Sequence, residues 1–236
     1  MLLAAGLQVV GAIIARVTTP IEPEHLPVND ETFSRPTKKS TGDWSAHIAT
    51  TLERLAEVLE TLTPEQWDAQ SLCSEWRVRD VVGHIIWRVG EANGTMLRTG
   101  LRAIGRGGFR FSKVVATIGV EHGDGSPEEL IARLHEIAAA KLQGEGRTGF
   151  IELIEAVVHS YDITEALDIP LRLSPRSTGA IARAQANAVP GNKHTRIART
   201  NSLRATDARW LVGTGSPIDA TAGEILMHLF GRRSLV

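Results

Sequence analysis

A carboxylate and an imidazole one helical turn apart are the residues of this sequence best suited to chemistry. They are Glu155 and His159, in the otherwise largely apolar segment Phe150–Ile163. Helical side chains four positions apart lie on one face, with Cβ atoms about 5 to 6 Å apart, so this pair could bind one cation. A helix that is apolar around most of its circumference is usually buried, and a buried carboxylate needs a partner. The pattern fits a metal site that lacks its third ligand, a satisfied Glu–His pair or a surface stripe.

The third ligand is best supplied by His84, one of eight histidines. Asp80 stands one turn before it, and metal-bound imidazoles commonly donate the proton of their second nitrogen to a carboxylate. Asp162 stands three residues after His159 and could serve that histidine in the same way. Two such His–Asp pairs on separate predicted helices favour a metal site, although a solvated stripe would show the same spacing. His47 is a more distant fourth candidate.

Successive amphipathic helices, without an alternating strand pattern before about residue 195, predict a helical bundle to position these side chains. The predicted helices span about 43–61, a short turn after Thr63, 77–103, 126–140, and a segment between Gly146 and Pro170. Beyond Pro170 we expect a helix to about 188, strands at 199–206 and 209–213, and a helix at 221–230. The fold class is therefore mainly α, with a small α+β C-terminal domain.

Three parts of the chain follow from this pattern: an extension and linker at 1–42, the bundle at 43–170 and the C-terminal domain at 171–236. The apolar residues 1–15 have no Lys or Arg before them and no clean cleavage site, and they are too short to span a bilayer comfortably. We therefore expect neither an export signal nor a membrane anchor. Prolines among polar residues in 17–42 indicate an extended linker.

The composition is that of an ordinary soluble protein of 236 residues with 42% hydrophobic content, a formal charge of −1 and a single cysteine. One cysteine excludes an intramolecular disulfide and fits the cytoplasm, and Cys73 is expected to be a small core residue. Residues 171–236 hold ten Lys or Arg against three acidic residues. This excess suggests an anionic ligand, docking onto the acidic remainder of the chain, or a solvated basic face. Dispersed arginines with few aromatic neighbours argue against nucleic acid.

Three stretches resemble the mycothiol-dependent maleylpyruvate isomerase family of the DinB-like superfamily. They are Leu62–Trp67, Ser71–His84 with its Glu-Trp-Arg-Val-Arg-Asp core, and Glu155–Asp162. The resemblance implies a DinB-like four-helix bundle that holds a divalent metal, usually zinc, through His84, Glu155 and His159. Residues 205–232 resemble a shortened form of the family's C-terminal domain.

The resemblance also implies an activity. Mycothiol would bind at the open position of the metal, and its thiolate would add to a small-molecule electrophile, expected to be anionic. An isomerase would then eliminate the thiol, whereas a transferase would release the adduct. Arg204 or Arg209 of the basic C-terminal segment could bind a substrate carboxylate. A metal-dependent hydrolase using the same site and a non-catalytic binding module remain as alternatives, and the oligomeric state is not predicted.

Overall fold

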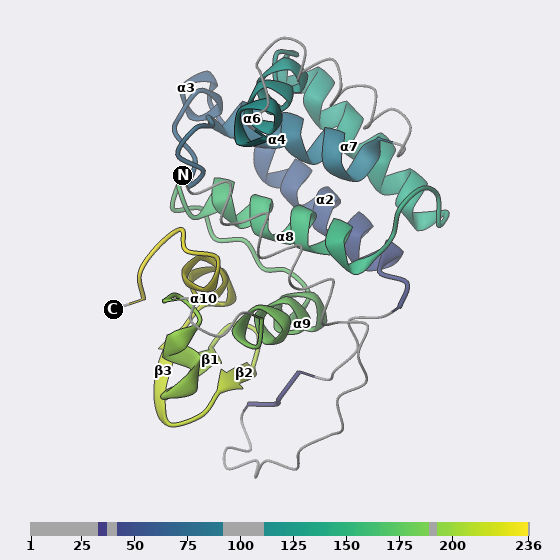
Figure 1. Ribbon diagram of the computed structural model, residues 1–236. Helices are drawn as coiled ribbons and strands as arrows, with labels where there is room; N and C mark the ends of the chain where they lie inside the picture. The colour runs from purple at the N-terminus through teal and green to yellow at the C-terminus, as the bar shows by residue number, and fades with distance from the viewer. Residues whose placement is uncertain (1–32, 37–41, 92–110, 189–192, 236) are drawn as a thin grey trace. The chain divides into compact units, whose positions relative to one another are not determined.

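The computed structural model describes residues 33–36, 42–91, 111–188 and 193–235 (Figure 1). The chain divides into two compact units, one of residues 43–171 and one that combines residues 172–235 with the segment 33–36. The predicted extension at 1–15 lies outside the described residues. No helix within the described ranges is both long enough and apolar enough to cross a membrane.

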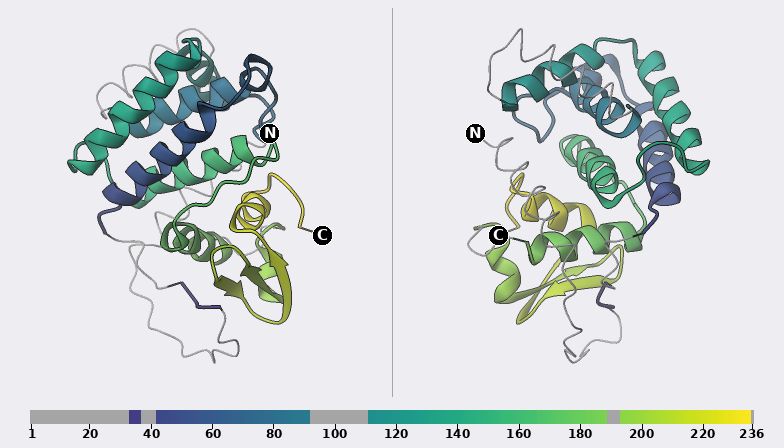
Figure 2. Two further views of the ribbon diagram at one scale, coloured as in Figure 1. Left: turned by 180° about the vertical axis from the view of Figure 1, so that it is seen from behind. Right: turned by 45° about the vertical axis from the view of Figure 1, so that its right-hand side comes forward.

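The first unit is a bundle of helices. Its elements are α2 (Ser45–Leu59), α3 (Pro64–Trp67), α4 (Val78–Ile85), the π-helical turn η1 (Ile86–Gly90), α6 (Phe111–His122), α7 (Pro127–Leu142) and α8 (Phe150–Thr164). Helix α2 packs on α7 and α8, and α4 packs on α6 and α8, as the two further views show (Figure 2). The prediction of a mainly helical fold that begins with a bundle is confirmed.

Local sequence signals explain where these helices begin and which face they bury. The residues of α2 that recur every three or four positions, Ile48, Leu52, Leu55 and Leu59, are all buried. Ser126 caps α7 by accepting a hydrogen bond from the backbone N–H of Glu129, whose carboxylate accepts one from the N–H of Ser126. Such a capping box satisfies two N–H groups that have no partner within the helix.

Helix α6 was not predicted, and the helix expected over 77–103 is α-helical only to Ile85 within the described residues. The segment that forms α6 contains β-branched residues and Gly119, which weaken helix propensity. In the structure, Gly83, Gly119 and Gly123 allow α4 and α6 to approach closely, because a Cβ atom on Gly83 would overlap the backbone of Gly119 and Gly123. Close packing of α4 on α6 therefore outweighs the weak local preference.

The second unit contains α9 (Pro175–Ala186), the 3₁₀ turn η2 (Arg196–Arg199), three strands and α10 (Ala222–Leu229). Strands β1 (Asn201–Ala205) and β2 (Trp210–Gly213) form the predicted pair and are antiparallel. The third strand, β3 (Ser216–Ala220), lies parallel to β1 and was not predicted. Its Pro217 argues against an interior strand, but an edge strand tolerates proline. The small α+β C-terminal part is confirmed.

The segment 33–36 lies within the linker predicted over 17–42. It is extended, but it is paired with the second unit. Ser34 forms a parallel bridge with Trp210, donates its backbone N–H to the carbonyl of Arg209 at 3.0 Å and accepts from the N–H of Leu211 at 3.1 Å. Arg183 of α9 donates to the carbonyl of Pro36 at 2.6 Å. These residues therefore extend the sheet beside β2.

Candidate metal centre

The three predicted ligands converge in the core of the first unit. His84 comes from α4, whereas Glu155 and His159 come from α8, and all three are buried. Oε2 of Glu155 lies 3.2 Å from Nε2 of His84 and 3.2 Å from Nε2 of His159. One ligand atom from each residue lies within 4.8 Å of the others. The structure therefore brings together the trio that spacing and resemblance indicated.

These atoms fit a divalent cation by type and by separation. Two imidazole nitrogens and one carboxylate oxygen are ligands that zinc accepts. Ligand atoms about 2.0 to 2.1 Å from a tetrahedral zinc lie about 3.3 to 3.4 Å from one another. The measured separations of 3.2 Å are close to that value. Three protein ligands leave a position for a further ligand, as in catalytic zinc sites.

The charges of the three residues differ. Burial lowers the pKa of His84 to about 4, because its hydrogen bond to Glu155 offsets only part of the desolvation. Burial alone would raise the pKa of Glu155, but hydrogen bonds from His159 and His84 and the charge of Arg88 hold that pKa well below its usual value. Glu155 is thus an anion beside a neutral His84, which favours a cation between them.

His159 is oriented by a carboxylate, as predicted. Its Nδ1–H donates to Oδ2 of Asp162 at 2.9 Å, which directs Nε2 toward Glu155. Burial alone would lower the pKa of His159, but hydrogen bonds with Asp162, Cys73 and Glu155 raise that pKa well above its usual value. Without a cation, the extra proton on Nε2 therefore holds the two side chains together.

Cys73 is buried, as expected, but it also belongs to this network. Its thiol donates to the same Oδ2 of Asp162 at 3.1 Å, and Sγ lies 3.8 Å from Nδ1 of His159. Cys73, His159 and Asp162 form a second group of potential metal ligands. Their N···O and S···O separations fit hydrogen bonds, so we assign this group to the orientation of His159.

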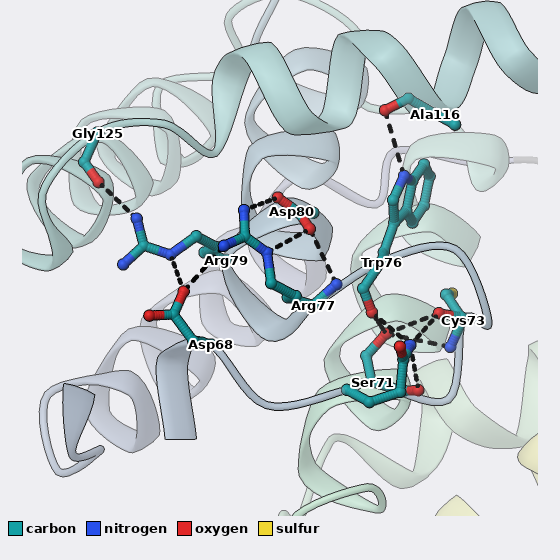
Figure 3. Close-up of polar contacts among 10 residues, drawn as sticks. Asp68, Ser71, Cys73, Trp76, Arg77, Arg79, Asp80, Ala116 and Gly125 are labelled. Carbon is teal, nitrogen blue, oxygen red and sulfur yellow. Dashed lines mark hydrogen bonds and ion pairs between the residues drawn. The ribbon is translucent and has the colours of Figure 1, made fainter. Parts of the chain in front are cut away.

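Asp80 forms no hydrogen bond with His84, contrary to prediction. Both of its carboxylate oxygens accept hydrogen bonds from Arg77: Oδ2 from the backbone N–H at 2.9 Å and from Nε at 3.1 Å, and Oδ1 from Nη2 at 3.1 Å (Figure 3). Asp80 stands at the third position of α4, where a carboxylate caps the helix. Nδ1 of His84 is buried and has no hydrogen-bond partner among the described residues.

Trp76 forms an aromatic wall of the site that sequence analysis missed. Its ring centroid lies 4.6 Å from that of His84. Its indole N–H donates to the carbonyl of Ala116 in α6 at 3.3 Å (Figure 3). The loop before it is fixed by the hydroxyl of Ser71, which donates to the Trp76 carbonyl at 2.7 Å. This Trp76 indole is buried and shields the imidazole of His84 from water.

Arg88, in η1, was also missed. Its Nε and Nη2 lie 3.1 and 2.9 Å from Oε1 of Glu155. The only sequence signal was its position four residues after His84. An ion pair with a residue 67 positions away cannot be read from local spacing.

The remaining candidates lie elsewhere. His47 is on α2, with its ring 5.4 Å from that of Trp44, and belongs to neither ligand group found among the described residues. Arg204 pairs with Asp219 on β3 through Nε at 2.5 Å and Nη2 at 2.7 Å. Arg209 is exposed and has a positive φ of 53° in the turn before β2. Both arginines belong to the second unit, and their binding of substrate stays a prediction.

Comparison with known proteins agrees with the motifs. Residues 48–144 match the family model described as "Mycothiol maleylpyruvate isomerase N-terminal domain". Similar solved structures include a mycothiol-dependent maleylpyruvate isomerase and a mutant of it, each 12% identical, with 80% of this chain and 89% of the other covered and a TM-score of 0.45. No curated protein matches the sequence. The predicted resemblance to the mycothiol maleylpyruvate isomerase family is therefore confirmed over residues 48–144.

Proposed function

We propose that this chain is a metal- and mycothiol-dependent enzyme that activates a thiolate for addition to a small, anionic electrophile. It would act as a maleylpyruvate isomerase-like enzyme or as a thiol S-transferase. The observation that carries the proposal is the convergence of Nε2 of His84, Oε2 of Glu155 and Nε2 of His159. The family model that matches residues 48–144 supports mycothiol as the thiol.

The residues around this point have distinct roles in the proposal. His84, Glu155 and His159 would hold a divalent cation, most simply zinc. Such a cation lowers the pKa of a thiol that reaches it, so that the thiolate is available near neutral pH. Asp162 accepts a hydrogen bond from Nδ1–H of His159 and directs Nε2 toward Oε2 of Glu155, where a cation would replace the proton on Nε2. Trp76 covers His84 and limits the access of water.

Recognition of a substrate carboxylate is assigned to the basic second unit. Arg209 is exposed, and its guanidinium can form a paired hydrogen bond with a carboxylate. Arg204 already binds Asp219 with two nitrogens, so a substrate would have to compete with that carboxylate. Within the proposal, Arg209→Ala should therefore weaken the preference for acidic electrophiles more than Arg204→Ala.

The first test is metal analysis of the purified full-length protein and of His84→Ala, Glu155→Ala and His159→Ala. We expect about one divalent cation per chain and a sharp loss in each variant. His135→Ala is the matched control, because this histidine lies on α7 and pairs with Glu53 at the surface. Full metal occupancy in His84→Ala would refute the ligand assignment.

The second test follows a maleylpyruvate-like diketo acid by its absorbance, with and without mycothiol and with and without a chelator. We expect isomerisation or thiol consumption that requires both mycothiol and the metal. Ester or amide hydrolysis without thiol, faster than any thiol reaction, would instead support the hydrolase. Protein that binds neither metal nor thiol would support a non-catalytic module.

A further inference from the structure

Arg88 forms hydrogen bonds with one oxygen of the Glu155 carboxylate, and the two histidines face the other. Both Nε and Nη2 of the guanidinium bind the same oxygen, Oε1, at 3.1 and 2.9 Å. The other oxygen, Oε2, faces His84 and His159 at 3.2 Å each. The side chains of Glu155 and Arg88 are 9% and 19% exposed, so this pairing forms largely out of water.

A carboxylate can offer a cation one oxygen or both. Hydrogen bonds between a guanidinium and a carboxylate are charge-assisted and stronger than neutral ones, particularly where water is excluded. A cation could recruit Oε1 only by displacing two such bonds. The pairing with Arg88 therefore opposes two-oxygen binding by Glu155.

We propose that Arg88 is a positioning residue that withholds Oε1 of Glu155 from the cation, so that a coordination position remains for the thiol. This inference rests on the proposed function, because it assumes a cation at His84, Glu155 and His159. Arg88 would act on the cation through Glu155, to which it is hydrogen-bonded.

The backbone around Arg88 is itself held in place. Arg88 lies in the π-helical turn η1, which begins two residues after His84. Nη2 of Arg147 donates to the carbonyl of Arg88, and Nε of Arg147 pairs with Glu152 at 3.4 Å. Single π-helical turns within α-helices occur frequently at functional sites. Here the turn places the guanidinium of Arg88 next to the carboxylate of Glu155 on α8.

The charge of Arg88 separates this role from simple structural support. A guanidinium beside Glu155 offsets part of its negative charge and so opposes cation binding. Its loss should leave cation affinity equal or higher, while the released Oε1 occupies a coordination position. A purely structural arginine would instead be expected to lower cation affinity when removed.

The test uses Co²⁺ as the probe in full-length wild type, Arg88→Met and Arg133→Met. Arg133 is the matched control, because it is a half-exposed arginine of α7 that pairs with Glu136. The visible absorption of Co²⁺ is strong with four ligands and much weaker with six. We expect a several-fold weaker band in Arg88→Met at undiminished affinity, and a wild-type spectrum in Arg133→Met.

Addition of mycothiol gives a second readout. Wild type should develop a sulfur-to-cobalt charge-transfer band, and Arg88→Met should develop a weaker one. If Arg88→Met does not fold, Arg88→Gln, which keeps one neutral N–H donor, should show the same changes to a smaller degree.

A variant with the wild-type cobalt spectrum and thiol band would overturn the role of Arg88, and so would weaker cation binding with an unchanged spectrum. Wild-type protein that binds neither Co²⁺ nor Zn²⁺ would overturn the proposed function as well. Failure of the inference alone is therefore distinguishable from failure of the metal site.

Discussion

Zinc binding at pH 6 should release about one proton per chain, and that proton should come from His159. Oε2 of Glu155 lies 3.2 Å from Nε2 of His159, where a shared proton or a shared cation can sit, but not both. Because the pKa of His159 is raised well above its usual value, Nε2 is protonated at pH 6. A metal ligand must lose that proton first.

The other two ligands contribute little to this count. The pKa of His84 is about 4, so His84 is neutral at pH 6, and the pKa of Glu155 lies well below its usual value. Zinc affinity should therefore change about tenfold, or about 1.4 kcal/mol, per pH unit between pH ~4 and the raised pKa of His159. Below pH ~4 a second proton, from His84, should steepen this dependence.

Isothermal titration calorimetry in two buffers of different ionisation enthalpy measures the protons released. Work at pH 6 avoids a contribution from zinc-bound water, whose pKa is about 7 in catalytic sites. Asp162→Asn removes the hydrogen bond that most raises the pKa of His159, so fewer protons should be released in this variant. Tight zinc binding without proton release in wild type, or equal release in wild type and Asp162→Asn, would refute the reasoning.

Three further predictions concern individual residues. Asp162→Asn should keep the fold but weaken zinc binding or turnover roughly 10- to 100-fold, as measured by metal titration. Asp80→Asn should leave zinc binding unchanged but lower the free energy of unfolding by about 1 kcal/mol through the lost helix cap, as measured by urea denaturation. Burial keeps the pKa of His84 at about 4 in the folded chain, whereas in the unfolded chain His84 takes up a proton below pH ~6.5. His84 should therefore lower the free energy of unfolding of the metal-free protein by about 3 kcal/mol as the pH falls from 6.5 to 4. An equally steep decline in a chelator-treated His84→Gln variant would contradict this prediction. Arg183→Met removes the hydrogen bond to the carbonyl of Pro36 and should speed proteolysis at residues 33–36, while Arg196→Met, at an exposed arginine of η2, should not.

Sequence reasoning worked best where the signal was local. The helices predicted at 43–61 and 126–140 each rest on residues within one element, and both are present in the structure. The ligand pair on α8 was visible for the same reason, because four residues of spacing define one helical face. His84 needed the resemblance as well, since its wheel position alone did not exclude a solvated stripe.

Residues that act across helices left little trace in the sequence. Arg88 and Cys73 reach Glu155 and Asp162 over separations of 67 and 89 residues. Periodicity identifies a face but not the side chain that will oppose it. Trp76 was noted only as part of a motif, and its position over His84 depends on how the preceding loop folds.

Asp80 shows how a correct spacing can have a different cause. It stands one turn before His84, as a supporting carboxylate would, but it is also the third residue of a helix that begins at Val78. The backbone N–H of Arg77 has no partner within the helix and takes the nearest carboxylate. The start of α4 was therefore the better guide to its partner.

The segment 33–36 makes the bundle an insertion in the sequence of the second unit. Its Ser34 is synthesised before residues 43–171, and its partner Trp210 is synthesised after them. During translation the sheet therefore cannot complete this edge until the bundle has left the ribosome. The entropic cost of joining distant chain segments grows slowly with loop length, and a bundle that has already folded leaves less flexible chain to order. Shortened chains that end after α8 would retain the whole metal centre but leave Ser34 without its strand.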